Sequence, residues 1–365
     1  MPLVVISAVN FTEGGPLTVL RECLAAAVAS LPDDWQIVAL VHDVNLIQES
    51  RVRLLPIPSA KRSWFARLYW EWWGFHRLSR QLQPALWLSL HDFTPRVVAE
   101  RQAVYCHNPA PFYRISLREA LLEPKFLLFN KFYIWVYRIL IKRNSHVIVQ
   151  QDWLRAEFLR RMGSLPIVVA HPSLQTVAPP QMAAMPSPQT VFLYPALPRV
   201  FKNIETLCEA ACVLASRGDQ DFEVRLTLDG TENRYAQWLK RRFGTSTQIR
   251  FIGHQTKEQM AQHYREADVV VFPSKLETWG LPITEAKAHS KPLLVADVPF
   301  AHETVGSYDL VSFFPCDSAS ALADLMQSVS ARRWVPTGNR QRQPDAPFAP
   351  DWESLWKLLT RGAQA

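Results

Sequence analysis

The sequence predicts an α/β protein made of two doubly wound parallel sheets. Three observations carry this prediction. Short apolar runs rich in β-branched residues alternate with helical patterns, a proline-rich and charge-free stretch interrupts the alternation, and 365 residues are enough for two domains. Apolar residues make up 48% of the chain and charged residues 20%, which excludes an intrinsically disordered protein.

The first predicted domain spans residues 1–172. Its opening strand is followed by a loop with Gly14 and Gly15 and by a helix that begins near Pro16, a residue suited to the first helical turn. The apolar runs predict strands at 3–9, 35–42, 87–92, 103–107, 146–150 and 167–171, and the helical patterns lie at 62–82, 126–141 and 152–162.

The second predicted domain spans residues 190–345 and follows a linker at 173–189. The stretch 172–189 contains five prolines and no charged residue, which is typical of a linker. After it, strands are expected at 190–196, 222–229, 249–253, 267–273 and 292–296, and helices at 202–216, 233–243, 256–266 and 280–289. Ligands of such sheets bind outside the carboxyl ends of the strands, so we expect the site in a cleft between the domains.

The last segment, 346–365, predicts one more helix. Asp351 is a suitable N-cap, and an apolar stripe follows it, made of Trp352, Leu355, Trp356 and Leu359. This helix could dock on either domain, and the N-terminal domain is the candidate.

Charge is spread unevenly along the chain. Residues 1–190 hold 20 Lys and Arg against 13 Asp and Glu, which accounts for the whole net charge of +7, whereas the 20 basic and 20 acidic residues of 191–365 cancel. Seven of the 13 tryptophans also lie between Trp64 and Trp153. The asymmetry indicates two domains with different partners.

The cysteines and the apolar runs bear on the cellular compartment. The five cysteines include no C-x-x-C pair, which excludes a zinc ribbon or a disulfide framework and favours a reducing cytosol. No apolar run reaches the ~18 residues of a membrane-spanning helix, and the start of the chain lacks the basic region of a signal peptide.

The densest functional motif is the segment 272–286, FPSKLETWGLPITEA, where a buried strand leads through a loop into a helix. The amides of Trp279, Gly280 and Leu281 lie at the expected helix N-terminus, where the helix dipole favours phosphate. Glu277 before the helix and Glu285 within it can accept hydrogen bonds from sugar hydroxyls. Taken singly, each could instead be a solvated carboxylate.

This E-x7-E motif in the second of two Rossmann-like domains resembles the retaining GT-B glycosyltransferases of family 4, the group 1 glycosyltransferases of bacterial polysaccharide synthesis. The resemblance extends over IRFIG at 249–253, DVVVFPS at 268–274 and KPLLVA at 291–296. It implies a GT-B fold, in which two Rossmann-like doubly wound domains face an interdomain cleft. It further implies that the C-terminal domain binds the nucleotide-sugar donor and the N-terminal domain the acceptor.

The resemblance also assigns roles within the motif. It implies that Glu277 is catalytic and faces the donor sugar, and that Glu285 binds the ribose hydroxyls. The remaining donor-binding residues that it implies are Thr278, Trp279, Gly280 and Leu281 around the diphosphate and Gly253 beside the nucleobase.

A second donor-binding element is expected at 194–203, YPALPRVFKN, where relatives carry G-R-L-x-x-x-K with both cations at the diphosphate. Lys202 fits the lysine position, but Leu197 stands where the arginine is usually found. Arg199, two residues further on, is the candidate replacement. A cation at a helix N-terminus opposes the helix dipole, and a bound anion would resolve that conflict.

Two places in the N-terminal domain are further candidates. The resemblance implies that the loop with Gly14 and Gly15 lies near the donor phosphate and the acceptor, although a plain tight turn would carry the same glycines. It also implies that His107, at the end of a buried strand, is catalytic near the reacting sugar. A structural histidine is the alternative for His107.

The reaction that follows is transfer of a hexose from a nucleotide-diphosphate sugar to a glycan or lipid-linked acceptor, with retained anomeric configuration. O-antigen or capsule synthesis, with a mannose, rhamnose or fucose type of donor, is the favoured context. No cofactor or metal is expected, since the D-x-D at 219–221 is read as a solvated turn. Paired acids for hydrolysis are not recognised. The alternatives are a GT-B nucleotide-sugar epimerase and a non-catalytic GT-B subunit that binds a partner transferase.

Basic aromatic segments suggest where the enzyme works. Residues 61–80 carry aromatic side chains over more than one helical stripe, and Trp64, Arg67, Trp72 and Trp73 are the candidate membrane contacts. We therefore expect a cytoplasmic protein that can lie on an anionic inner-membrane surface. The alternative for the aromatic side chains of residues 61–80 is that they pack in the core. The similar segment 126–141 is expected to pack mainly as core. No nucleic-acid-binding motif is recognised.

Overall fold

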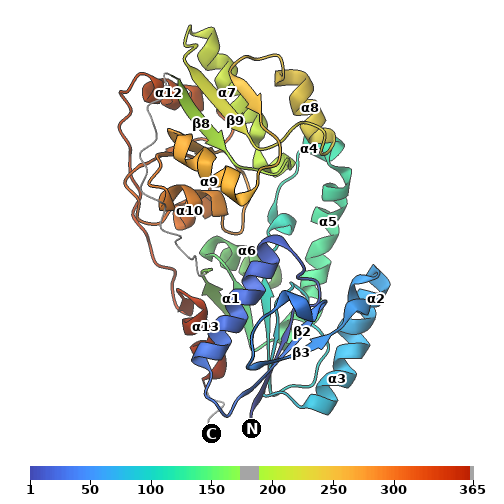
Figure 1. The fold of residues 1–365 in the computed structure, drawn as a ribbon. Helices are drawn as coiled ribbons and strands as arrows, with labels where there is room; N and C mark the ends of the chain where they lie inside the picture. Colours follow the sequence, from blue (N-terminus) through green and yellow to red (C-terminus); the bar gives the residue numbers. More distant parts are fainter. Residues whose placement is uncertain (173–188, 362–365) are drawn as a thin grey trace. The chain divides into compact units, whose positions relative to one another are not determined.

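The computed structural model describes residues 1–172 and 189–361. Within these residues the chain forms two compact units, each built on one parallel sheet (Figure 1). The first unit comprises residues 1–112, 130–172 and 344–361, and the second comprises residues 113–129 and 189–343. The expected linker, apart from Gln189, lies outside the described residues.

The first unit holds an eight-stranded sheet in the order β14-β7-β6-β5-β4-β1-β2-β3, and each neighbouring pair of strands is parallel. Its strands are β1 (Leu3–Ser7), β2 (Gln36–Val41), β3 (Val52–Pro56), β4 (Leu86–Ser89), β5 (Arg101–Cys106), β6 (His146–Val149), β7 (Ile167–Ala170) and β14 (Phe348–Ala349). Every residue of β1 is buried, as its continuous apolar sequence predicts for a central strand. The strand order reverses between β1 and β4, which makes this the switch point of the sheet.

The helices of the first unit follow most of the predicted patterns. They are α1 (Gly14–Ser30), α2 (Trp64–Tyr69), α3 (Phe75–Leu82), the part of α5 (Pro124–Arg138) from Asn130 on, α6 (Asp152–Met162) and α13 (Trp352–Thr360), with short 3-10 turns η1 (Val44–Leu46), η2 (Pro58–Lys61), η4 (Ala110–Phe112) and η5 (Ile141–Arg143). The helix expected over 62–82 contains a π-helical turn, η3 (Trp70–Gly74), between α2 and α3. Gly74 is needed there because a Cβ would collide with the Trp70 ring.

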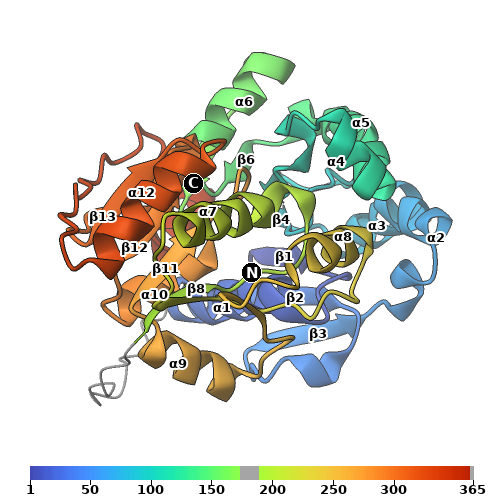
Figure 2. The same ribbon diagram turned by 90° about the horizontal axis from the view of Figure 1, so that it is seen from above.

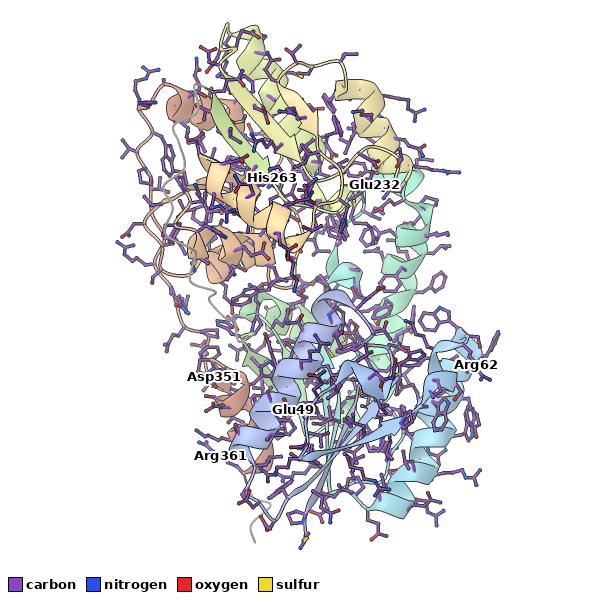
Figure 3. The ribbon with its side chains drawn as sticks, viewed as in Figure 1. Glu49, Arg62, Glu232, His263, Asp351 and Arg361 are labelled. Atoms are coloured by element: carbon purple, nitrogen blue, oxygen red, sulfur yellow. The ribbon has the colours of Figure 1, made fainter. Side chains whose placement is uncertain are left out.

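The C-terminal helix α13 belongs to the first unit and packs against α1. Its stripe of Trp352, Leu355, Trp356 and Leu359 is buried, the Trp356 indole N–H donates to the Cys23 carbonyl at 3.1 Å, and the Trp352 ring stacks on Tyr105. Asp351 caps the helix by accepting from the Ser354 amide at 2.7 Å. Figure 3 labels Asp351 and Arg361 at the two ends of this helix.

The second unit holds a six-stranded parallel sheet in the order β10-β9-β8-β11-β12-β13. Its strands are β8 (Thr190–Tyr194), β9 (Phe222–Leu226), β10 (Ile249–Phe251), β11 (Val269–Phe272), β12 (Leu293–Ala296) and β13 (Val311–Phe314). The helices are α4 (Leu117–Leu122), α7 (Ile204–Ser216), α8 (Arg234–Phe243), α9 (Lys257–Glu266), α10 (Leu281–Ala288), α11 (Pro299–Val305) and α12 (Ala319–Ser330), with the 3-10 turn η6 (Val200–Lys202). Helices α7 and α12 lie side by side (Figure 2).

The structure departs from the predicted boundary at one segment, residues 113–129. The prediction placed this segment in the first domain, but it groups with the second unit. Glu119 of α4 accepts from Tyr113 at 2.6 Å and lies 3.9 Å from the Lys275 ammonium, and the rings of Phe126 and Phe201 meet at 5.4 Å. The contacts of Glu119 with Lys275 and of Phe126 with Phe201 join residues far apart in sequence, so no local pattern marks the boundary.

Candidate functional site

The candidate donor site is built at the switch point of the second sheet. Strand β8 lies between β9 and β11, so the strand order reverses between β8 and β11. The loops that follow these two strands leave the same edge of the sheet, which is where doubly wound folds bind their ligands. The first loop leads through η6 into α7, and the second leads from Phe272 into α10. Both sequence motifs therefore lie at one edge.

Lys202 and Glu277 meet across these two loops. The Lys202 ammonium lies 2.5 Å from Glu277 Oε1, and the Ser274 hydroxyl donates to the same oxygen at 2.8 Å. The two charged side chains are only 15% and 14% exposed, so they are well shielded but within reach of a ligand. An ion pair of this kind presents both a cation for phosphate and a carboxylate for hydroxyl groups.

Asn203 holds the two loops together, a role that the sequence did not indicate. Its side-chain amide donates to the carbonyls of Pro273, at 3.1 Å, and Cys316, at 2.8 Å. Its backbone is left-handed, with φ 55°, and its side chain is buried. Asparagine tolerates this conformation better than most residues, which allows η6 to turn into α7 at this point. Lys202 is therefore carried on a loop that is fixed to its partner loop.

The start of α10 has the form expected of an anion site. Gly280 caps the helix with φ 86° and ψ 62°, and no side chain caps it. A Cβ at Gly280 would lie 3.3 Å from the Phe272 ring and would adopt a strained backbone, so glycine is required. Thr278 is partly exposed, Leu281 is exposed, and the buried Trp279 indole donates to Thr284 at 3.2 Å.

Glu285 lies on the exposed side of α10, apart from the Lys202–Glu277 pair. Its Oε2 accepts from the Tyr264 hydroxyl at 2.6 Å, and the Tyr264 ring stacks on His289. Burial and the charge of Glu285 raise the pKa of Tyr264, so this hydroxyl stays a neutral donor. The contact fixes one carboxylate oxygen of Glu285 and keeps the side chain ordered at the helix surface.

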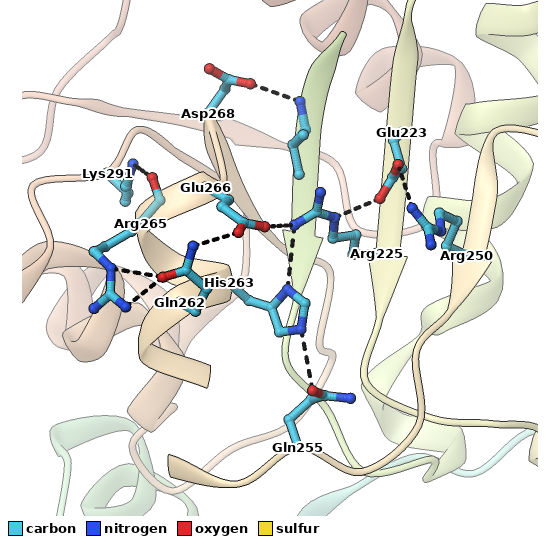
Figure 4. Close-up of polar contacts among 11 residues, drawn as sticks. Glu223, Arg225, Arg250, Gln255, Gln262, His263, Arg265, Glu266, Asp268 and Lys291 are labelled. Atoms are coloured by element: carbon cyan, nitrogen blue, oxygen red, sulfur yellow. Dashed lines mark hydrogen bonds and ion pairs between the residues drawn. The ribbon is translucent and has the colours of Figure 1, made fainter. Parts of the chain in front are cut away.

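The strand end at Gly253 is supported by a polar network (Figure 4). Gly253 has φ 74°, and the Gln255 side-chain amide donates to the Ile252 carbonyl at 2.6 Å and the Gly253 carbonyl at 3.2 Å. His263 in turn contacts Gln255 at 3.2 Å and Arg225 at 3.3 Å. Burial and Arg225 lower the pKa of His263, so the imidazole is neutral at pH 7. Residues of α9 and β9 thus belong to the network that supports the loop at Gly253.

Arg199 forms its ion pair with Glu123 and not with Glu277, although its guanidinium and the Lys202 ammonium both lie near the Phe201 ring, at 5.4 and 5.8 Å from its centroid. Its guanidinium donates to Glu123 Oε1 at 2.9 Å and lies over the rings of Phe126 and Phe201. Glu123 also accepts from the Val200 amide at 3.2 Å. In this structure Arg199 therefore binds the segment 113–129 to the second unit.

The candidate site residues of the first unit follow its strands β1 and β5. Gly14 and Gly15 are exposed, and α1 begins at Gly14, with φ 61°, instead of near Pro16. His107 follows β5 with its side chain 27% exposed, and its Nδ1 lies 3.7 Å from Asp92 Oδ1. The sequence reading did not single out Asp92.

The candidate membrane residues separate into exposed and buried ones. Trp64 and Trp73 are exposed, at 60% and 56%, and Trp72 is partly buried. The expectation for Arg67 is wrong, because its side chain is buried and pairs with Glu71 at 2.7 Å. In a helix packed on a sheet the inner face is closed to a membrane whatever its charge.

Helix α5 is more exposed than expected. It packs Phe126, Tyr133 and Tyr137 inward, but Leu128, Phe129, Phe132 and Trp135 are exposed. The expectation that this segment serves mainly as core therefore describes only one face of the helix. Figures 1 and 2 both draw α2 and α5 as neighbours, and Figure 3 shows Arg62 at the outer side of α2.

Within residues 1–172 and 189–361, no group of three His, Cys, Asp or Glu side chains is placed to hold a metal ion. Asp219 Oδ1 accepts from the Asp221 amide at 3.3 Å, which makes the D-x-D an exposed turn. None of the helices in this part of the chain is long and apolar enough to span a bilayer.

Comparison with known proteins places both motifs within one family match. Residues 181–343 match the family model described as glycosyl transferases group 1. A D-inositol 3-phosphate glycosyltransferase of Corynebacterium diphtheriae is 32% identical over 105 residues, 27% of this chain and 24% of that protein. The O-antigen chain mannosyltransferase B of Escherichia coli is 30% identical over 134 residues, 36% of this chain and 35% of that protein. The matches thus span about a third or less of these relatives.

Solved structures resemble the chain over most of its length. Sucrose-phosphate synthase from Thermosynechococcus elongatus has a TM-score of 0.66 at 18% identity, covering 91% of this chain and 90% of that one. WaaG, a glycosyltransferase involved in lipopolysaccharide biosynthesis, has a TM-score of 0.64 at 12% identity, covering 98% and 94%. These similarities and the two parallel sheets confirm the predicted GT-B fold, and residues 181–343 are similar to the group 1 glycosyl transferases.

Proposed function

We propose that this protein is a retaining glycosyltransferase that moves a hexose from a nucleotide-diphosphate sugar to a glycan or lipid-linked acceptor. The observation that carries the proposal is the Lys202–Glu277 pair at the switch point of the second sheet, inside the segment that matches group 1 glycosyl transferases. A shielded cation beside a carboxylate suits a ligand that carries both phosphates and hydroxyl groups.

In the proposed complex the donor diphosphate takes Lys202 and the first amides of α10 as its partners. Glu277 then accepts from hydroxyl groups of the sugar, and Glu285, held by Tyr264, accepts from the ribose. The loop at Gly253 lines the base. Arg199 contributes only if it leaves Glu123, so Lys202 is the principal side-chain cation of the proposal.

The chemistry requires that charge is stabilised on the leaving group. The bond between the anomeric carbon and the diphosphate oxygen breaks, and the electron pair goes to the diphosphate, where Lys202 and the α10 N-terminus stabilise it. The acceptor hydroxyl attacks the anomeric carbon on the face that the diphosphate leaves, and its proton passes to the departing diphosphate oxygen, so the configuration is retained. We propose that His107 meets the reacting sugar and that neither a metal nor a cofactor takes part.

We propose that the product of this transfer is a bacterial surface polysaccharide such as O-antigen or capsule. This is supported by the similarity to an O-antigen chain mannosyltransferase and by the structural likeness to a lipopolysaccharide outer core galactosyltransferase, which has a TM-score of 0.60. We propose a mannose, rhamnose or fucose type of donor, and the similarity to a mannosyltransferase supports the first of these sugars. Complexes of another structural neighbour hold UDP and glucose or UDP-glucose.

A panel of donors tests the enzymatic proposal. The protein is titrated with UDP, GDP, ADP and TDP sugars by thermal shift, and the donor that stabilises it is incubated with polysaccharide or lipid-linked acceptors in the presence of EDTA. We expect a product whose new glycosidic bond has the anomeric configuration of the donor. An inverted product, a strict metal requirement, or isomerisation of the donor without acceptor would each contradict a part of the proposal.

We also propose that the protein works at the cytoplasmic face of an anionic membrane. The support is a surface of exposed aromatic side chains on α2, η3 and α5, formed by Trp64, Phe65, Tyr69, Trp73, Phe132 and Trp135. Exposed basic residues accompany it, among them Arg62 and Lys131. Aromatic rings at the headgroup level and cations above it are typical of interfacial binding.

Vesicle sedimentation tests the membrane proposal. We expect the protein to pellet with vesicles of anionic phospholipid and not with neutral ones, and we expect a Phe65→Ser, Trp73→Ser variant to pellet at least ten-fold less. Val335→Ser, which removes an 80% exposed apolar side chain elsewhere, is the matched control and should pellet like the wild type. Equal pelleting with both vesicle types would exclude the proposal.

A further inference from the structure

Asp92 is a buried carboxylate at the switch point of the first sheet. It follows β4, the strand that lies beside β1, and its side chain is almost fully buried. Its backbone is left-handed, with φ 62°, a conformation that costs free energy in any residue other than glycine. Strain of this kind persists only where the surroundings fix the residue. The contacts of Asp92 therefore indicate which part of the structure depends on this conformation.

Four donors converge on the Asp92 carboxylate. Oδ1 accepts from the backbone amides of His107, at 2.7 Å, and Asn108, at 3.2 Å, and from the Tyr137 hydroxyl at 2.8 Å. Oδ2 accepts from the Tyr133 hydroxyl at 3.0 Å. Burial, reinforced by the Asp92 charge, raises the pKa of both tyrosines, which therefore remain donors. The carboxylate thus joins the end of β5 to α5.

The same carboxylate faces the ring of His107. The imidazole Nδ1 lies 3.7 Å from Asp92 Oδ1, is shielded from solvent, and has no hydrogen-bond partner among the described residues. The edge of the Phe11 ring and the tilted Tyr105 ring, at 5.6 and 6.2 Å between centroids, enclose the imidazole. A separation slightly longer than a hydrogen bond is common in a free enzyme and shortens when substrate binds.

We propose that Asp92 is the positioning residue of His107: it fixes the loop that carries the histidine and receives Nδ1–H, so that the lone pair of Nε2 is turned to the substrate. The inference rests on the proposed function, in which His107 meets the reacting sugar. A carboxylate that orients an imidazole selects its tautomer, and losing such a partner removes much of the activity without changing the substrate contacts.

Neighbouring titratable groups do not compete with Asp92 for this role. His91, the preceding residue, bonds to Ser7 at 3.0 Å, and burial together with Arg67 lowers its pKa far enough to keep it neutral. Burial and the Asp92 charge raise the pKa of the Cys106 thiol, which is neutral as well. The charge that faces His107 from this side is therefore that of Asp92.

A kinetic cycle of Asp92→Asn, His107→Ala and the double variant tests the inference in the full-length enzyme. We expect Asp92→Asn to lower kcat about 10–100-fold while the KM for the donor changes less than three-fold. In the His107→Ala background, Asp92→Asn should lower kcat less than two-fold further. Multiplicative losses would show that Asp92 acts apart from His107 and would overturn the inference. Tyr133→Phe, which leaves the two amides in place, is the control and should lower kcat less than five-fold.

Imidazole ¹⁵N NMR gives a readout that needs no activity. At pH 8, where an ordinary imidazole is neutral, we expect the His107 signal of the wild-type protein, identified by its loss in His107→Ala, to show a protonated Nδ1 and an unprotonated Nε2. A protonated Nε2 would overturn the inference, whether or not the Asp92 variant folds. If the expected tautomer is found but His107→Ala retains full kcat, the positioning stands and the catalytic part of the proposed function fails.

Discussion

The clearest test of the site architecture is the replacement of Asn203 by alanine. Its side-chain amide donates to the carbonyls of Pro273 and Cys316, and its carbonyl oxygen accepts from the Thr206 hydroxyl at 2.9 Å. These bonds link the loops after β8, β11 and β13 at a position that is 1% exposed. The substitution therefore removes the side-chain hydrogen bonds by which residue 203 holds the loops, and it leaves the backbone in a left-handed conformation.

The expected decrease in the free energy of unfolding follows from the contacts that Asn203→Ala removes. The Pro273 carbonyl, which is buried, and the Cys316 carbonyl, which is partly buried, lose their donor at about 1–2 kcal/mol each. Alanine in place of asparagine adds about 1 kcal/mol of strain at φ 55°. Asn203→Ala should therefore lower the free energy of unfolding by about 3–5 kcal/mol. Asn203→Gly loses the same bonds without the strain and should be about 1 kcal/mol more stable than the alanine variant.

Urea denaturation followed by circular dichroism measures both differences, and Asn45→Ala, at an exposed asparagine, is the matched control with an expected change below about 0.5 kcal/mol. Because the loops carry Lys202 and Glu277, the folded Asn203→Ala variant should also bind the nucleotide sugar at least ten-fold more weakly by calorimetry. A loss of stability below about 1 kcal/mol, or a glycine variant no more stable than the alanine one, would refute the reasoning.

Three further predictions follow from the charges and the core. Lys202→Ala should lower kcat/KM about 100–1,000-fold, whereas Lys257→Ala, at the exposed start of α9, should change it less than two-fold; equal effects would place the diphosphate elsewhere. Burial raises the pKa of Glu71 to about 7 despite Arg67, so the stability it contributes is full below about pH 4.5 and is lost as the pH rises through about 7. The difference in unfolding free energy between wild type and Glu71→Gln should fall over that range, and a flat difference would contradict the shift. Trp356→Ala should cost about 3–5 kcal/mol in denaturant titrations, and a cost below 1 kcal/mol would show that α13 is not part of the core.

The sequence predicted the fold, and it made the two candidate motifs recognisable, because both depend on local patterns. Buried parallel strands are continuous apolar runs, and helices between them repeat every 3.6 residues, so the alternation of the two can be read directly. The edge strand β3 was missed because its exposed positions break the apolar run. The loop with Glu277 was found because a strand end, a glycine and a helix start follow one another along the chain.

Contacts between distant segments could not be predicted in this way. Arg199 is a candidate for the diphosphate, and its ion pair with Glu123, 76 residues away, could not be predicted from the local sequence. Arg67 was a candidate for the membrane because a stripe of aromatic and basic residues has the same spacing whichever face packs inward. What decides the outcome is Glu71, one turn further on, which is fully buried and draws the guanidinium inside.

The two residues that organise the loops share a property that sequence patterns hardly register. Asp92 and Asn203 each follow a strand beside the switch point of their sheet, and each has a positive φ and a side chain bonded to several neighbours. Asp and Asn reach this conformation at the lowest cost after glycine, and unlike glycine they bring hydrogen-bonding groups with them. A loop that needs a positive φ and also side-chain hydrogen bonds to its neighbours therefore favours these two residue types. This requirement for a positive φ together with side-chain hydrogen bonds is met by Asp92 in the first unit and by Asn203 in the second.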